Sequence, residues 1–174
     1  MPTGGLAGFS PAYFGMVMAT GILSITSHAL GLSRLALALF GLNVAVYALL
    51  WVLTVLRAAY HPRRFFGDMT DHLRGPGFFT AVAATSVLAS EFVLLAGDHE
   101  TAAALGVFAV VLWVALTYTI FTALTIKERK PALDEGVSGA WLLAVVATQS
   151  LAMLAALLAV EVRPPYKVGL NFFA

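Results

Sequence analysis

The sequence has no cysteine and few charged residues, and both absences exclude classes of protein. Charged residues make up 11% of its 174 residues, and the formal net charge is +1. A chain without cysteine is not a disulfide-stapled secreted module, and one with so little positive charge is not a nucleic-acid binder with a basic patch. Soluble domains carry about 25% charged residues, so this chain has too few to cover the surface of a soluble globule.

Apolar residues dominate instead, at 60% of the sequence with a mean hydropathy of +0.90, which also excludes a disordered chain. Five continuously apolar runs lie between clusters of charge, at about 12–32, 35–56, 76–96, 102–126 and 139–160. Each is close to the roughly 17–25 residues that cross a bilayer core as a helix. The strands of a β-barrel would instead alternate in polarity. We therefore expect an all-α integral membrane protein with five transmembrane helices in one domain, 1–174.

The two ends of the chain leave alternatives open. The first run could be a secretory signal peptide, but it lacks a basic stretch before it and is longer than the apolar core of such a signal. Residues 168–174 follow Pro164 and Pro165, which cannot continue a helix. They read as the start of a sixth apolar helix, with a short interfacial tail as the alternative.

Lysine and arginine are unevenly distributed between the two sides of this arrangement. The loops after the second and fourth runs hold seven of them, whereas the opposite side holds three, at Arg34, Arg163 and Lys167. Because basic loops tend to face the cytoplasm, we expect a multi-pass protein of the plasma membrane with a cytoplasmic N-terminus. Four of the seven form what we call the basic mouth: Arg57, Arg63, Arg64 and Arg74.

A few polar residues lie inside the apolar runs, where they are costly and tend to face the bundle interior or a water path. Thr20 and Ser24 share one face of the first run, and Gln149 lies near the middle of the fifth. Serine and threonine in such helices more often bond to the backbone or across a helix contact. Glu91 lies roughly a turn and a half from the end of the third run, so it could instead simply reach external water.

Signatures of enzyme chemistry are missing from the sequence. It has no cluster with metal-ligand spacing, no nucleophile beside a general base and no glycine-rich phosphate loop. We therefore expect no enzyme activity, no bound metal and no cofactor.

Glycine and proline distinguish the odd-numbered runs from the even-numbered ones. Pro11, Gly15 and Gly21 lie in or just before the first run, and Pro76 and Gly77 open the third. Such residues bend or loosen membrane helices where a cavity or a neighbour compensates. The second and fourth runs are richer in large apolar side chains. We expect runs one, three and five to form an inner layer and runs two and four to face lipid.

Residues 9–22 resemble the opening helix of the tellurite-resistance/dicarboxylate transporter family, which also contains yeast malate permeases, fungal sulfite pumps and plant slow anion channels. The residues that carry this resemblance are a proline, an aromatic residue and a Met-x-Thr-Gly sequence: Pro11, Phe14, Met18, Thr20 and Gly21. A second likeness covers 76–86, where a proline and paired aromatic residues precede a small, threonine-rich helix. A third is Trp-Leu-Leu at 141–143, where Ala144 stands in place of the proline of many members.

The resemblance implies a bundle of ten helices in five hairpins around a pore, of which this chain would be the N-terminal half. Odd-numbered helices line that pore in the family, in agreement with the inner layer expected above. The gating phenylalanine of the family lies on the ninth helix and cannot be carried over to this chain. Resemblance and polar pattern together give these candidates for the pore or substrate path: Phe14, Thr20, Gly21, Ser24, Thr85, Ser86, Glu91 and Gln149.

We therefore expect a transporter or channel for small anions, such as malate-like C4-dicarboxylates or inorganic anions, of the tellurite-resistance type. No lysine or arginine lies in the middle of a run, which favours a channel or a weak-binding carrier. Expected partners are the anion, the lipid bilayer and further copies of the chain in a homo-oligomer, but no nucleic acid. The alternative is a non-transporting membrane scaffold subunit or an inactive truncated fragment.

Overall fold

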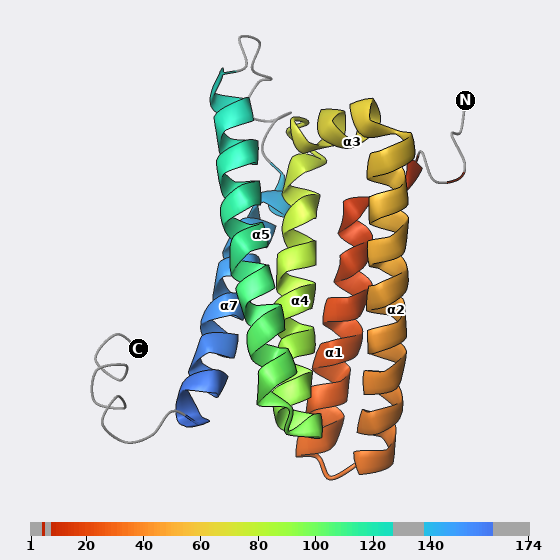
Figure 1. Cartoon of the computed structure of the whole chain (residues 1–174), viewed down its shortest axis with the longest axis vertical. Helices are drawn as coiled ribbons and strands as arrows, with labels where there is room; N and C mark the ends of the chain where they lie inside the picture. Colours follow the sequence, from red (N-terminus) through yellow and green to blue (C-terminus); the bar gives the residue numbers. More distant parts are fainter. Residues whose placement is uncertain (1–4, 6–7, 127–137, 162–174) are drawn as a thin grey trace.

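The computed structural model describes residues 5, 8–126 and 138–161 (Figure 1). Regular structure in this part of the chain is helical throughout, which confirms the all-α expectation. The five long helices run side by side in alternating directions (Figure 1): α1 (Phe14–Ala29), α2 (Ser33–Tyr60), α4 (Phe79–Glu91), α5 (His99–Ile126) and α7 (Leu142–Glu161). A short helix that the apolar pattern did not predict, α3 (Pro62–Met69), lies across one end between α2 and α4.

Tight 3₁₀ turns precede α1, α4 and α7, at Pro11–Tyr13, Gly75–Phe78 and Gly139–Trp141. Proline opens the first of these turns because its fixed φ suits a helix start and its missing N–H would have no partner there. The Ser10 hydroxyl accepts a hydrogen bond from the Ala12 N–H at 3.3 Å and so caps the same turn.

Glycines and one aspartate mark the connections at the opposite end of the bundle. Gly31 turns the chain between α1 and α2 with a φ of 78°, and Gly97 ends a π-helical turn, Phe92–Ala96, with a φ of 65°. Both angles are in the left-handed region that glycine adopts without steric cost. Asp98 then caps α5, since its Oδ1 accepts a hydrogen bond from the Thr101 N–H at 3.0 Å.

Four helical segments of the described chain are long and apolar enough to cross a membrane: Ser33–Tyr60, Gly75–Ala96, His99–Ala123 and Gly139–Val160. The remaining long helix, α1, has 16 residues, which rise about 24 Å, less than the roughly 30 Å of a hydrocarbon core. A crossing by α1 therefore stays a prediction. The proposed start of a sixth helix at 168–174 lies outside the described residues.

Helix α4 is the centre of the bundle and packs along α1, α5 and α7, whereas α2 packs mainly on α1. All 13 residues of α4 are buried, and most are alanine, serine, threonine or valine. Small side chains let helix backbones approach closely, which is how one helix can be enclosed by several neighbours. The expected two layers are not established, because α1 and α7 bury one narrow stripe each and are otherwise as exposed as α2 and α5.

Candidate functional site

Two polar side chains meet in the buried contact between α2 and α4. Asn43 and Glu91 are both 0% exposed. The Asn43 Nδ2 lies 2.5 Å from the Glu91 Oε2, across 48 residues of sequence. The remaining oxygens of the pair, Asn43 Oδ1 and Glu91 Oε1, are buried and have no hydrogen-bond partner. The carboxyl group of Glu91 is therefore enclosed by protein and does not reach external water, which was the alternative left open by the sequence.

Helix α1 covers this polar pair with its backbone. A Cβ atom added at Gly21 would lie 2.5 Å from Val87 Cγ1, 2.9 Å from Asn43 Nδ2 and 3.1 Å from Glu91 Oε2. Glycine at this position is thus what lets α1 pack against the pair. One turn along α1, the fully buried Ser24 borders the Glu91 carboxyl group, and its hydroxyl donates to the Ala36 carbonyl oxygen at 2.9 Å.

A second polar contact lies further along the same seam. The Tyr47 and Thr85 hydroxyl oxygens are 2.9 Å apart, and the Thr85 hydroxyl is 2.7 Å from the Ala81 carbonyl oxygen. Phe14 is buried beside them, with its ring edge-on to Tyr47 and to Trp51. Two of the sequence-based candidates, Phe14 and Thr85, thus both contact Tyr47. Phe14 and Thr85 are both buried in this helix contact.

The other candidates occupy different environments. Ser86 is fully buried, and its hydroxyl donates to the Val82 carbonyl oxygen one turn earlier at 3.1 Å. That is the backbone-bonding role expected for most membrane serines. Thr20 is half-buried on α1, and Gln149 is exposed on the outer side of α7. The structure therefore gathers Gly21, Ser24 and Glu91 into one cluster and leaves Gln149 apart from it.

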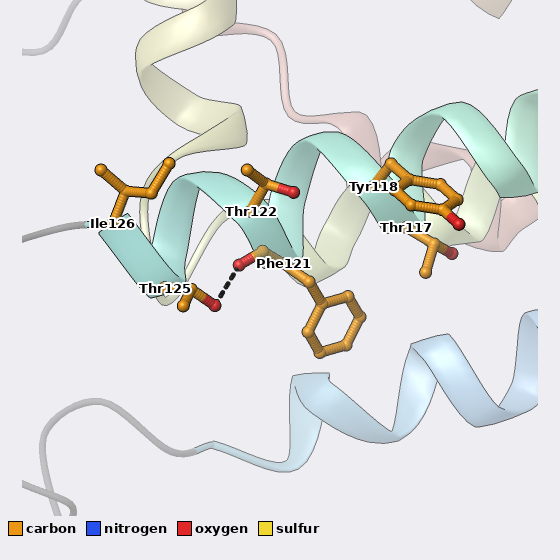
Figure 2. Close-up of a pocket in the computed structure, with 6 residues that line it drawn as sticks. All are labelled: Thr117, Tyr118, Phe121, Thr122, Thr125 and Ile126. Carbon is orange, nitrogen blue, oxygen red and sulfur yellow. Dashed lines mark hydrogen bonds between the residues drawn. The ribbon is translucent and has the colours of Figure 1, made fainter.

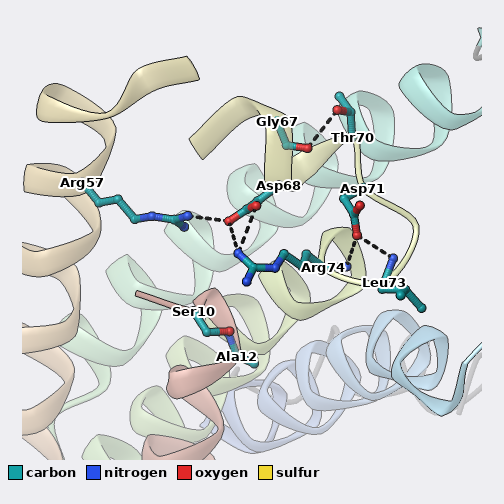
Figure 3. A network of polar contacts seen from close by, with 9 residues as sticks. All are labelled: Ser10, Ala12, Arg57, Gly67, Asp68, Thr70, Asp71, Leu73 and Arg74. Carbon is teal, nitrogen blue, oxygen red and sulfur yellow. Dashed lines mark hydrogen bonds and ion pairs between the residues drawn. The ribbon is translucent and has the colours of Figure 1, made fainter. Parts of the chain in front are cut away.

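The basic mouth is partly neutralised by an acidic residue that the sequence argument did not use (Figure 3). Asp68 on α3 accepts hydrogen bonds from both the Arg57 and the Arg74 guanidinium groups. The Arg57 side chain is 1% exposed and lies over the Phe65 ring, whereas the Arg74 side chain is 55% exposed. Asp71 accepts from the Arg74 backbone N–H at 2.9 Å and so fixes the turn into α4. The network ties the ends of α2, α3 and α4 together.

The remaining two arginines of the basic mouth, Arg63 and Arg64, lie on α3 and are exposed. Their guanidinium groups are accessible at this end of the bundle, as is that of Arg74. Asp68 could have been suspected from the sequence, because it lies among arginines. However, Arg57 lies on α2 and Asp68 on α3, and they meet because the chain turns between the two helices, so the pairing was not predictable from spacing.

A shallow groove of about 360 Å³ lies at the far end of α5 (Figure 2). Its lining comes from that one helix: Thr117, Tyr118, Phe121, Thr122, Thr125 and Ile126. None of the sequence-based candidates contributes to it. The Thr125 hydroxyl donates to the Phe121 carbonyl oxygen at 2.7 Å, so it is used within the helix.

The described residues contain no group of three or more histidine, aspartate or glutamate side chains placed to hold a metal ion. The polar groups of the described helix bundle are hydroxyl and amide groups and the Glu91 carboxyl group, with guanidinium groups at one end. Hydroxyl and amide groups can solvate a passing ion without binding it tightly, and exposed arginines raise the local concentration of anions.

Comparison of the sequence with known protein families shows to which family the chain belongs. The sequence profile described as voltage-dependent anion channel matches residues 8–173. The chain belongs to this family, which confirms the resemblance seen in the sequence. No curated protein and no solved structure matches the chain. Members of the family are anion channels and transporters, and the chain is a multi-pass membrane protein of that general class.

Proposed function

We propose that this voltage-dependent anion channel family member conducts small anions across the plasma membrane. The proposed substrates are C4-dicarboxylates such as malate or simple inorganic anions, with tellurite resistance as the proposed type. The observation that carries the proposal is the family match over 8–173, nearly the whole chain. The four apolar helices long enough to span a bilayer support it.

Charge placement supports weak interaction with the permeating ion. The arginines of the described residues lie at helix ends or in the connections, and Arg57 is held by Asp68. A path lined by neutral groups lets an anion enter and leave, because conduction needs binding that is favourable but weak. In the proposed orientation the N-terminus is cytoplasmic, and the exposed Arg63 and Arg64 attract anions to the cytoplasmic side.

The candidate residues for the anion path differ in how exposed their side chains are. Gln149 is exposed near the middle of α7, where a polar amide facing lipid would be costly, and Thr20 is half-buried on α1. We propose that these two side chains contact the permeating anion. Phe14, Thr85 and Ser86 are enclosed in helix contacts and are proposed to hold the path in shape.

Ion flux in proteoliposomes tests the proposal. The purified chain is reconstituted, and the efflux of chloride, malate and tellurite is measured against that of potassium. We expect anion efflux well above potassium efflux. Gln149→Leu should reduce it, whereas Met153→Leu, one turn further along the same exposed face, should leave it unchanged. Equal passage of anions and potassium, or no flux of any of these anions, would contradict the proposal.

A further inference from the structure

The most unusual group in the bundle is the carboxyl group of Glu91. It is fully buried near the end of α4, in contact with the equally buried Asn43 of α2. A buried carboxylate is normally compensated by a cation or by several hydrogen-bond donors, because removing its charge from water costs several kcal/mol. Here the amide of Asn43 is the hydrogen-bonding contact, and the Glu91 Oε1 has no partner.

Titratable groups on α1 and α2 are placed away from this carboxyl group. His28 is exposed at the end of α1, about 10 Å along the helix axis from Gly21. Arg34 is exposed at the start of α2, about 14 Å along the axis from Asn43. The Tyr47 hydroxyl is engaged with Thr85 further along the seam.

The other elements around α4 add little charge. Helix α5 begins with His99 and Glu100, beyond the π-helical turn that follows Glu91, and Glu100 is exposed. The side chains described on α7 include no titratable group. The ion pairs of Arg57 and Arg74 are both with Asp68, at the opposite end of α4.

The hydrogen-bonding partners around Glu91 also favour a protonated carboxyl group, which can donate a hydrogen bond, over a carboxylate, which can only accept one. Ser24 borders the carboxyl group, but its hydroxyl proton is directed to the Ala36 carbonyl oxygen at 2.9 Å. A hydroxyl has one proton and two lone pairs, so Ser24 can still accept a hydrogen bond and has no second proton to donate. An ionised Glu91 has no proton to offer to it.

The contact between Glu91 and Asn43 accommodates a carboxylic acid as donor. The nitrogen and oxygen of an asparagine amide are assigned from their hydrogen bonds. Turning the Asn43 amide by half a turn places its carbonyl oxygen against Glu91, where it accepts from a carboxylic acid.

We propose that Glu91 and Asn43 form a proton-binding site within the membrane. Glu91 holds the proton as a carboxylic acid, and the Asn43 carbonyl oxygen accepts the hydrogen bond. Release of that proton to water leaves a carboxylate, and the Asn43 amide then meets it by turning its N–H group toward the carboxylate oxygen. Proton uptake and release are therefore coupled to the orientation of the Asn43 amide between α2 and α4.

Infrared spectroscopy of the chain in lipid reads the protonation state directly. The C=O stretching band of a carboxylic acid is separate from carboxylate bands and shifts in D₂O. At neutral pH the wild-type chain should show this band, and Glu91→Gln should lose it. Glu100→Gln, which changes an exposed glutamate at the start of α5, should retain it. A wild-type spectrum without the band, or a band that persists in Glu91→Gln, would overturn the proposal.

Asn43→Ala provides a second test that keeps the glutamate. Removing the acceptor should leave the carboxylic-acid band in place but move it to higher frequency, because a hydrogen bond donated by the acid lowers that frequency. A band unmoved by Asn43→Ala would exclude the proposed pairing. Neither measurement depends on ion flux, so failure of the anion-transport proposal and failure of this one are distinguishable.

Discussion

Replacing Gly21 by alanine should force α1 away from α4. The added Cβ would lie 2.5 Å from Val87 Cγ1, whereas carbon atoms pack at about 3.5–4.0 Å. The helices would have to separate by roughly 1 Å at this point. The added Cβ would also lie 2.9 Å from Asn43 Nδ2 and 3.1 Å from Glu91 Oε2, so the crowding is not confined to Val87.

The expected size follows from two opposing terms. Overpacking in a close-packed interior costs about 1–3 kcal/mol, and replacing a helical glycine by alanine returns up to about 1 kcal/mol. Gly15→Ala is the matched control, because Gly15 is in the same helix and its added Cβ meets nothing within 4 Å. The difference in unfolding free energy between the two variants isolates the packing term, and we expect about 1–3 kcal/mol.

Reversible unfolding of the purified chain in mixed micelles, followed by circular dichroism as denaturing detergent is added, measures this difference. A third variant, Gly21→Ala with Val87→Ala, removes the nearest of the three crowding atoms and should recover part of the lost stability. Equal stability of Gly21→Ala and Gly15→Ala would refute the close packing of α1 on the polar pair.

Asp68→Asn should destabilise the chain by about 3–5 kcal/mol because it leaves Arg57 buried without a counter-charge. Arg74→Gln should cost no more than about 1 kcal/mol because its ion pair is solvent-exposed; similar unfolding midpoints for the two variants would contradict the network. Asp98→Ala should lower the midpoint at neutral pH. Hydrogen bonds from the Thr101 side chain and backbone hold the pKa of Asp98 below its ordinary value, so this stabilisation is present above the ordinary carboxyl pKa and lost as the pH falls through the lowered one. A variant whose deficit stays constant on acidification would argue against the cap.

The helices were predictable because each follows from the length and continuity of an apolar run. Helix α2 nevertheless extends from Ser33 to Tyr60, past the end of its run. The apolar run ends at residue 56 because the charged Arg57 follows it. The helix continues because Asp68 and Phe65 receive the guanidinium group. Helix α3 was not predicted because charged residues interrupt any apolar run there. Its stability comes from contacts that form only when the chain has folded.

Candidate residues were predictable as polar positions inside apolar runs, but their partners were not. Glu91 and Gln149 were both singled out for being rare in such runs. The structure buries Glu91 against Asn43, 48 residues away in the chain, and leaves Gln149 exposed. No local periodicity relates residues so far apart, so which polar side chain meets which was decided by how α1, α2 and α4 pack.

The enclosed position of α4 has a consequence for the biosynthesis of the protein. Its segment, Gly75–Ala96, has a mean hydropathy of 1.8, compared with 2.2 for each of the other three candidate spans. It also carries Glu91, a costly group to place in lipid. Helices α1 and α2 precede α4 in the chain, so Asn43 and the cover provided by Gly21 have been synthesised before Glu91 leaves the ribosome. Two of the helices that enclose α4, the candidate span with the lowest mean hydropathy, are thus synthesised before α4 itself.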